Sequence, residues 1–386
     1  RQDFDLIRQL GANLIRIYDA PPSWLLDLAS EHELKLLIDL PWNKDSTFLD
    51  SISQQRELRD RLCQLIRPAT GHKAVLGYSV VNEVAPDIVR WSGAEHVEDF
   101  IDSLVDAIKN VDAEALCTFG NYPPTEFLRP QLVDFISCNV YLHDPRVFEN
   151  YLSRLQMIAN NQPLVLSEFG MDSLSEGEPA KCALLASQIE AGFRHGLAGT
   201  IVYAFTDDWF KDGAAVEGWE MGIVDRDRQP KASYQTVQQQ YRSAPYFPLP
   251  RTPQVSVVVA SYNGSRTLAS CLKSLTTLNY PNYEILLVDD GSDDDTCRIV
   301  SSFPEVKYIH QDHLGLSVAR NTGIAAAKGE IIAFTDADCR ADEDWLYYAV
   351  GDLLQSECAG MGGHNFLPRD DGPVAAAVMA SPGGPA

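Results

Sequence analysis

Short apolar runs alternate with longer amphipathic stretches along residues 2–242 of the chain. Because the runs are brief and rich in Val, Ile and Leu, they predict buried strands. The seven runs cover residues 13–18, 35–41, 75–81, 116–120, 135–141, 164–167 and 200–204. The stretches between them repeat apolar side chains at helical spacing, as residues 97–111 and 181–195 do, and predict helices. A strand followed by a helix, seven times over, predicts a parallel sheet.

The number of these units is one short of a (β/α)8 barrel, whose usual length is about 250 residues. Residues 2–10 have the pattern of an amphipathic helix and lead through Gly11 into the first run, which is the order found after strand one of such a barrel. We therefore expect residues 1–243 to form an α/β (β/α)8 barrel that lacks its first strand. Because no initiator Met is present, we also expect that residue 1 is not the native start.

The segment at residues 244–254 contains four prolines and predicts a linker, because proline removes a backbone donor and fixes φ. After it the alternation restarts over residues 255–386. Strands are expected at residues 255–260, 284–289, 306–310 and 330–335, and helices at 265–277, 294–302 and 317–327. This order predicts a second, doubly wound (Rossmann-like) α/β domain, whose ligand should lie at the carboxyl ends of its strands.

Composition and charge exclude several classes of protein. The chain has 386 residues, of which 45% are hydrophobic and 22% charged, as in folded globular proteins. A formal net charge of −23 disfavours binding to nucleic acids and anionic lipids. The eight cysteines form no CxxC pair, so no structural zinc is expected. No apolar run is long enough for a membrane segment and no export signal opens the chain, so we expect a cytoplasmic location, with membrane association of the full-length protein left open.

Polar residues at the ends of the predicted barrel strands are candidates for catalysis, because barrel active sites lie at the carboxyl ends of the strands. Asn82 and Glu83 close the fourth strand of the complete barrel, and Glu168 closes the seventh. These ends face each other across the mouth. Two carboxyl groups about 5 to 5.5 Å apart suit retaining glycoside hydrolysis, whereas a wider gap admits a water and gives inversion.

This arrangement resembles the clan A retaining β-glycosidases and is similar to the β-galactosidase and β-glucuronidase TIM barrels over residues 2–242. The resemblance implies that Glu83 is the acid/base, Glu168 the nucleophile and Asn82 the partner of the sugar 2-hydroxyl. No cofactor is implied for the barrel.

The same resemblance implies three further contacts near the sugar. Tyr141 would donate a hydrogen bond to the nucleophile, Trp209 would form the aromatic platform under the sugar, and Arg16 would keep the nucleophile ionised. A structural ion pair is the alternative reading of Arg16. For Asp207 and Asp208, which precede Trp209, a solvated loop is the expectation.

In the second domain, three predicted strands end in small or acidic residues. Ala260 ends the first strand and Tyr262 follows it, and Asp289 ends the second strand and Asp290 follows it. The last strand leads into the sequence Asp-Ala-Asp at residues 336–338. Because residues two apart in extended backbone point the same way, both of these carboxylates can approach one hard divalent cation.

Together with Gly-Leu-Ser-Val-Ala-Arg-Asn-Thr-Gly at residues 315–323, these motifs resemble the family 2 glycosyltransferases of the GT-A fold, over residues 253 to about 366. The resemblance implies roles for seven residues at the donor. Ala260 and Tyr262 would line the nucleotide, Asp290 or Asp289 would accept from uracil, Arg320 would lie near the base or phosphates, Asp336 would meet the ribose or the metal, and Asp338 would hold Mn2+ or Mg2+.

The sequence thus predicts a bifunctional, carbohydrate-active enzyme. An inverting, metal-dependent glycosyltransferase that uses a nucleotide sugar, expected to be a UDP-sugar, is joined to a retaining β-glycoside hydrolase or transglycosylase. An oligo- or polysaccharide is the expected acceptor, in polysaccharide or glycoconjugate assembly. The alternative is a glycosyltransferase whose barrel only binds glycan. The acceptor-side motifs of the transferase family do not occur before residue 386, so we expect this chain to bind donor and to transfer it poorly.

Overall fold

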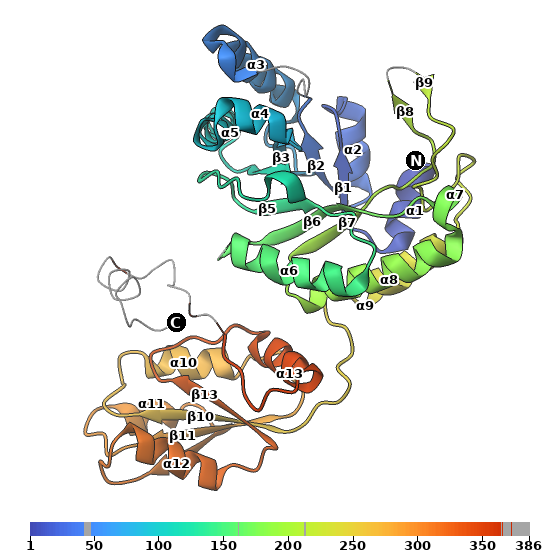
Figure 1. Cartoon of the computed structure of the whole chain (residues 1–386). Coiled ribbons are helices and arrows are strands. Elements are labelled where there is room, and N and C mark those ends of the chain that lie inside the picture. The colour runs from blue at the N-terminus through green and yellow to red at the C-terminus, as the bar shows by residue number, and fades with distance from the viewer. Residues whose placement is uncertain (42–47, 161, 212–213, 364, 366–371, 373–386) are drawn as a thin grey trace. The chain divides into compact units, whose positions relative to one another are not determined.

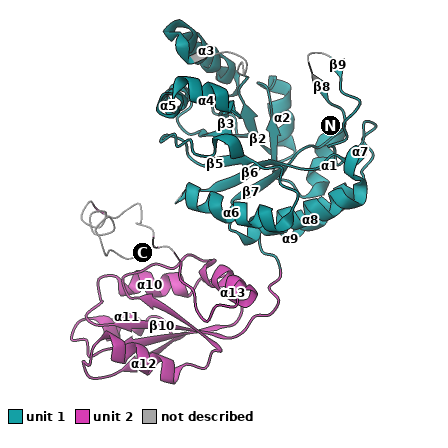
Figure 2. Ribbon diagram, viewed as in Figure 1, with its two compact units in different colours: residues 1–247 teal, residues 248–386 magenta. Residues whose placement is uncertain are grey.

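The computed structural model describes residues 1–41, 48–160, 162–211, 214–363, 365 and 372. The chain divides into two compact units, residues 1–247 and 248–386 (Figure 2). The division falls inside the proline-rich segment at residues 244–254. Among the described helices, none has the length and apolar character needed to cross a lipid bilayer.

The first unit is a nearly closed parallel barrel of seven strands (Figure 1). The strands are β1 (Leu14–Ile17), β2 (Lys35–Asp39), β3 (Val75–Asn82), β4 (Leu116–Asn121), β5 (Ile136–Asn139), β6 (Leu164–Phe169) and β7 (Gly199–Val202). They pair in sequence order, and each pair is parallel. In the described part of the chain no ladder joins β1 to β7. The seven predicted strands and the barrel without its first strand are confirmed.

Helices cover the outside of this barrel. They are α1 (Gln2–Leu10), α2 (Ser23–Glu31), α3 (Ile52–Ile66), α4 (Pro86–Ser92), α5 (Ala94–Lys109), α6 (Pro145–Ala159), α7 (Ser173–Glu176), α8 (Glu178–Arg194) and α9 (Ala232–Ser243), with short 3-10 turns η1 (Phe48–Asp50), η2 (Arg67–Ala69) and η3 (Pro123–Thr125). The β7–α9 connection also contains a small hairpin of β8 (Phe210–Lys211) and β9 (Ala214–Ala215). Helix α5 shows why these helices form, because its apolar residues recur at helical spacing and are buried against the barrel.

The helix predicted at residues 2–10 is confirmed as α1. It ends at Gly11, whose φ of 91° is a left-handed conformation that glycine adopts without steric cost. Helix α1 contacts α9 and the residues just before α9 through two polar interactions. Tyr234 donates from its hydroxyl to the Leu6 carbonyl at 2.7 Å, and Arg228 pairs with Asp3 at 3.0 Å.

The second unit contains a four-stranded parallel sheet in the order β12-β11-β10-β13. Its strands are β10 (Val255–Ser261), β11 (Tyr283–Asp289), β12 (Val306–His310) and β13 (Ile331–Asp336), and its helices are α10 (Leu268–Leu275), α11 (Thr296–Val300), α12 (Leu316–Ala326) and α13 (Trp345–Gln355). The predicted strands are confirmed, and this unit has the expected doubly wound GT-A fold. Helix α10 begins three residues later than predicted, after a turn in which the N–H groups of Thr267 and Leu268 both donate to the carbonyl of Gly264.

Strand register brings the candidate donor residues to one edge of this sheet. Ala260 pairs with Asp336 of β13, and the next residue, Ser261, pairs with Asp289 of β11. Strand β10 has β11 as its neighbour on one side and β13 on the other, so the direction in which strands are added to the sheet reverses at β10. Ligands of open α/β sheets bind at such a reversal, outside the carboxyl ends of the strands.

Candidate active sites

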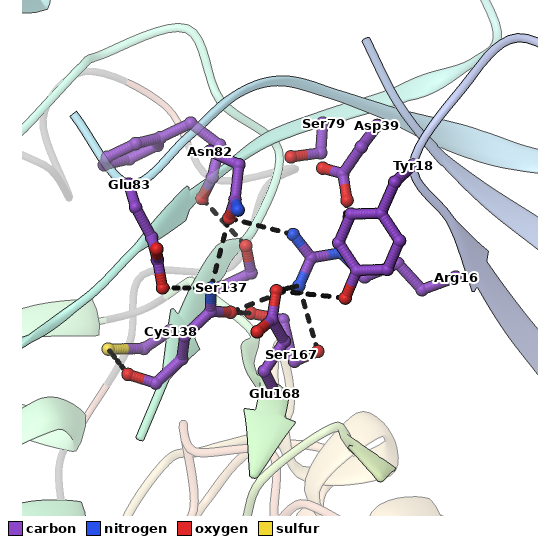
Figure 3. Close-up of polar contacts among 12 residues, drawn as sticks. Arg16, Tyr18, Asp39, Ser79, Asn82, Glu83, Ser137, Cys138, Ser167 and Glu168 are labelled. Carbon is purple, nitrogen blue, oxygen red and sulfur yellow. Dashed lines mark hydrogen bonds and ion pairs between the residues drawn. The ribbon is translucent and has the colours of Figure 1, made fainter. Parts of the chain in front are cut away.

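Glu168 closes β6 and receives hydrogen bonds from three side chains of the barrel mouth. Arg16 donates to Oε1 at 2.9 Å and Tyr18 donates to the same oxygen at 3.0 Å (Figure 3). Tyr141 donates to Oε2 at 3.0 Å. All three partners are donors, so they favour the ionised carboxylate.

The charge of Glu168 is set by opposing influences. Burial raises the pKa of the carboxyl most strongly; the Arg16 guanidinium lowers it, the nearby carboxylate of Glu83 raises it, and the hydroxyls of Tyr18 and Tyr141 lower it. The net effect is a pKa above the ordinary value of a glutamate. The pKa values of both tyrosines are raised as well, by burial and by Glu168, so their hydroxyls remain donors.

Arg16 of β1 donates hydrogen bonds to both Glu168 and Asn82 and so links the two strand ends that carry the candidate residues. Its side chain is buried and donates to Asp39 at 2.5 Å and to Asn82 at 3.0 Å, in addition to Glu168 (Figure 3). It also donates to Asn139 at 3.1 Å and to the carbonyl of Ser167 at 3.0 Å. Burial alone would lower the pKa of the guanidinium, but the carboxylates raise it, and Arg16 stays charged.

Replacing Arg16 with methionine is expected to lower the free energy of unfolding of the barrel by about 3 to 5 kcal/mol, because the change leaves buried carboxylates without their cation. The matched control is Arg8→Met, since Arg8 pairs with Glu33 at 2.8 Å on the surface, where such a pair contributes about 0 to 1 kcal/mol. Urea unfolding followed by circular dichroism measures both. Equal losses in the two variants would show that the Arg16 cluster is not stabilising.

Glu83 and Asn139 complete the polar cluster. The side-chain amide of Asn139 donates to Glu83 at 2.9 Å and to Asn82 at 3.1 Å. Glu83 itself has a φ of 54°, a left-handed backbone conformation that is rare for residues other than glycine. Its N–H donates to the carbonyl of Gly120 at 2.7 Å. A Cβ at Gly120 would lie 2.1 Å from the side-chain oxygen of Asn82, so a larger residue here would displace Asn82 from its contacts with Arg16 and Asn139.

Three aromatic residues, Tyr203, Trp209 and Trp219, pack together on the connection that follows β7. The ring of Tyr203 lies 6.3 Å from that of Tyr18 and 6.5 Å from that of Tyr141, between centroids. Trp209 and Trp219 each lie 5.9 Å from Tyr203, and these residues line a small pocket. The structure therefore places Trp209 against Tyr203, whose ring lies near the two tyrosines that donate to Glu168.

Two lysines, of which Lys181 is buried and Lys231 partly buried, hold the loop that carries these rings. Lys231 pairs with Asp207 at 2.5 Å, and Asp207 accepts from the N–H of Gly222 at 2.7 Å. Lys181 donates to the carbonyls of Glu220 and Gly222, and burial lowers its pKa to about 8. Asp207 is only 4% exposed, so the expectation of a solvated loop was wrong for this residue. An acidic residue after a strand does not reveal the lysine that pairs with it, which here is the residue before α9.

Among the residues of this site that were not identified from the sequence are Tyr18, Asn139 and Tyr203. The sequence held a signal that could have identified Tyr18 and Asn139. Tyr18 is two residues from Arg16 and Asn139 two residues from Tyr141, and such pairs point to the same side of extended backbone. No candidate residue lies two positions from Tyr203, so this signal could not have identified it.

In the second unit, Asp289 and Asp290 are buried and already accept several hydrogen bonds. Asp289 accepts from the N–H of Ser292 at 2.9 Å and from Tyr308 at 2.5 Å. Burial raises its pKa, but these donors outweigh burial and lower it overall. Asp290 accepts from Gln311 and from the N–H groups of residues 314 and 315. Both carboxylates thus shape the loops beyond β11 and β12.

The other donor candidates lie around this edge. Ala260 is buried, and the ring of Tyr262 stacks on that of His313 at 3.9 Å between centroids. Arg320 of α12 donates to Asp336 at 2.8 Å. Asp338 follows two residues later and is exposed.

The carboxylates of Asp336 and Asp338 suit a hard cation. No cluster of three or more His, Cys, Asp or Glu ligands occurs among the residues that the structure describes. Mg2+ and Mn2+ are nevertheless bound through one or two carboxylates when a substrate phosphate and waters complete the coordination. Two exposed carboxylates beside a basic residue fit that requirement.

Comparisons with known proteins support both halves. Residues 1–245 match the family "Glycosyl hydrolases family 2, TIM barrel domain", and residues 256–373 match "Glycosyl transferase family 2". Glycosyltransferase AglE of Haloferax volcanii is 34% identical over 131 residues, which are 32% of this chain and 43% of AglE. Glycosyltransferase GlyA of Streptococcus pneumoniae is 38% identical over 97 residues, which are 24% of this chain and 14% of GlyA.

Solved structures support the barrel fold. The β-glucuronidase of Ruminococcus gnavus, in complex with D-glucuronic acid, has a TM-score of 0.55 and 19% identity, covering 62% of this chain and 45% of its own. The β-glucuronidase of Bacteroides uniformis has a TM-score of 0.55 and 18% identity, covering 68% and 35%. The chain spans less than half the length of each of these four proteins. Through residues 1–245 the chain belongs to the TIM-barrel family of the family 2 glycosyl hydrolases, and over residues 256–373 it carries a family 2 glycosyltransferase domain.

Proposed function

We propose that the barrel is a retaining β-glycoside hydrolase or transglycosylase, with Glu168 as nucleophile and Glu83 as acid/base. The observation that carries the proposal is the setting of Glu168, whose two oxygens accept from Arg16, Tyr18 and Tyr141. Asn139 links this carboxylate cluster to Glu83. The alternative is a barrel that only binds glycan.

In the proposed reaction, a carboxylate oxygen of Glu168 attacks the anomeric carbon of the sugar. The bond to the leaving oxygen breaks, and that oxygen takes the proton of Glu83. In the second step Glu83 removes a proton from water, the water oxygen bonds to the anomeric carbon, and the carboxylate of Glu168 is released. Two inversions retain the β configuration.

The second unit, in this proposal, is an inverting glycosyltransferase that uses a UDP-sugar. Ala260 and Tyr262 would line the nucleotide, while Asp289 or Asp290 would accept from uracil and Arg320 would lie near the base or phosphates. Asp336 and Asp338 would hold Mn2+ or Mg2+, which offsets the charge of the diphosphate when bound. The carboxyl ends of β10, β11 and β13, aligned by Ala260, Asp289 and Asp336, support this placement. The joint product would be a polysaccharide or glycoconjugate, which one unit extends and the other trims.

A panel of chromogenic β-glycosides tests the barrel, with the stereochemistry of the first product followed by proton NMR. We expect cleavage of at least one sugar with the β anomer as first product. An α anomer would contradict the retaining mechanism. Glycan binding without cleavage of any member would favour the alternative.

Tyr141 gives a prediction about pH. Glu168 must be ionised to attack, so kcat/KM should fall as the pH drops through its raised pKa. The Tyr141→Phe variant removes a donor to the carboxylate and should move this acid limb to higher pH by about one unit. The measurement is kcat/KM against pH on a nitrophenyl β-glycoside, with Tyr246→Phe as control. A shift to lower pH, or none, would contradict the assignment of Glu168.

A further inference from the structure

Asn139, the last residue of β5, uses its whole side chain in hydrogen bonds and is only 1% exposed. Its amide oxygen accepts from Arg16 at 3.1 Å and from the hydroxyl of Ser167 at 2.8 Å. Its amide nitrogen donates to Asn82 at 3.1 Å and to Oε1 of Glu83 at 2.9 Å. An asparagine amide has two hydrogens to donate and two lone pairs to accept with, so these partners use all of its capacity.

The partners also fix the orientation of this amide. A guanidinium has only donors, so the atom of Asn139 that faces Arg16 must be the oxygen. The nitrogen then faces Glu83, whose ionised carboxylate can only accept. A flipped amide would oppose donor to donor at Arg16 and acceptor to acceptor at Glu83. The guanidinium on one side of Asn139 thus keeps its N–H directed at the carboxyl group on the other side.

Glu83 is therefore held at both its backbone and its carboxyl group. Its φ of 54° lies in the left-handed region, and its N–H donates to the Gly120 carbonyl at 2.7 Å. Asn139 donates to Oε1, and a protonated oxygen is a weaker acceptor than an unprotonated one. The proton of the acid form is accordingly carried by the other oxygen, Oε2. When that proton leaves, the N–H at Oε1 stabilises the carboxylate that forms.

We infer that Asn139 is the positioning residue of the acid/base, which holds Oε1 of Glu83, leaves the proton to Oε2 and strengthens the acid by stabilising its ionised form. The inference rests on the proposed glycosidase function. In the first step the Oε2–H bond breaks and the proton passes to the leaving oxygen, while the N–H of Asn139 stays on Oε1. In the second step Oε2 takes a proton from the water whose oxygen bonds to the anomeric carbon.

The other titratable groups around Glu83 can be separated from the effect of Asn139. Four of them sense the charge of Glu83, and burial is the larger cause of the raised pKa in each: Glu168, Tyr122, Tyr203 and Cys138. The tyrosine hydroxyls and the thiol therefore stay neutral near pH 7. The charged pair of Arg16 and Glu168, joined at 2.9 Å, does not include an atom of Asn139 and remains when Asn139 is replaced.

The kinetic test uses two variants and two substrates of the sugar that the chromogenic panel selects. Asn139→Ala removes the donor, whereas Asn139→Asp keeps the shape and the acceptor for Arg16 but puts an oxygen in place of the N–H. The substrates are the phenyl β-glycoside, whose leaving group needs a proton, and the dinitrophenyl β-glycoside, whose leaving group does not. We expect the ratio of kcat/KM for phenyl to kcat/KM for dinitrophenyl to fall by about 10- to 100-fold in both variants.

The pH profile gives a second readout of the same contact. For the phenyl glycoside, the basic limb of kcat/KM marks the loss of the acid proton. It should move to higher pH by about one unit in Asn139→Ala, and further in Asn139→Asp because a like charge then faces Glu83. A merely structural role would lower both substrates equally and leave the limb in place, because a smaller folded fraction reduces all rates alike.

Asn110→Ala is the matched control, since Asn110 also donates to a carboxylate, that of Asp106 at 3.2 Å, on the exposed surface at the end of α5. It should change neither the ratio nor the limb. Carbon-13 NMR of glutamate enriched at the carboxyl carbon follows Glu83 without any substrate, and Glu83→Gln assigns its signal. The midpoint of this titration should rise in Asn139→Ala.

The outcomes separate the role of Asn139 from the glycosidase proposal. Equal losses with both substrates and an unmoved NMR midpoint would overturn the role of Asn139 and leave the glycosidase proposal standing. A raised midpoint in a protein that cleaves no glycoside would support the control of Glu83 by Asn139 and contradict hydrolysis. An unmoved midpoint without any cleavage would overturn both.

Discussion

Replacing Glu168 with alanine is expected to abolish the cleavage of activated β-glycosides, with a loss in kcat on the order of 10^4- to 10^6-fold. Without this carboxylate no covalent glycosyl intermediate forms, and Arg16, Tyr18 and Tyr141 lose their common acceptor. The measurement is nitrophenol release from the glycoside that the panel identifies. Circular dichroism checks that the barrel remains folded.

Glu83→Ala should behave differently from Glu168→Ala. The acid/base contributes about 10^2- to 10^4-fold to poor leaving groups and little to good ones in the first step. Azide, which needs no general base, should restore turnover of a good leaving group and yield the β-glycosyl azide. Glu149→Ala, on the exposed surface of α6, is the matched control. Substantial activity in Glu168→Ala, or an α-glycosyl azide from Glu83→Ala, would contradict the assigned roles.

UDP is expected to bind the second unit at least 10-fold more tightly with Mn2+ than with EDTA. Residues 253–386 carry 8 basic and 18 acidic side chains, so this unit repels a diphosphate unless a cation offsets the charge. Isothermal titration calorimetry measures the dissociation constant in both conditions. Asp338→Asn should remove most of the dependence on metal.

Asp352→Asn, an exposed change on α13, keeps the net charge of the Asp338→Asn variant and is its control. If charge alone governs binding, the two variants will have equal dissociation constants for UDP. Equal binding of UDP with and without metal would contradict the role of Asp336 and Asp338.

The order of elements could be predicted from the sequence because each depends on local periodicity. All seven barrel strands are short apolar runs between amphipathic helices, which is the pattern of a parallel sheet buried on both faces. Glu83 and Glu168 were found for the same reason, since each closes such a run. The helix α13 follows the last predicted strand and was not predicted.

The partners of these residues could not be predicted, because they come from distant parts of the chain. Asn139 bonds to Glu83 across 56 positions, and nothing near either residue indicates the other. Asp207 likewise pairs with Lys231, which stands just before α9, and nothing in the sequence near Asp207 indicates this partner. Strand order places such groups at the same end of a barrel but does not determine which atoms touch.

The long reach of Arg16 has a consequence for how the barrel folds. Its contact with Glu168 spans 152 positions and joins β1 to β6, with four strands between them in the sheet order. Contacts between residues so far apart in the sequence tend to form late in folding, because the entropy cost of closing the long loop comes before the contact can stabilise the chain. We therefore expect hydrolytic activity, where it is found, to return later in refolding than the helical circular dichroism signal does.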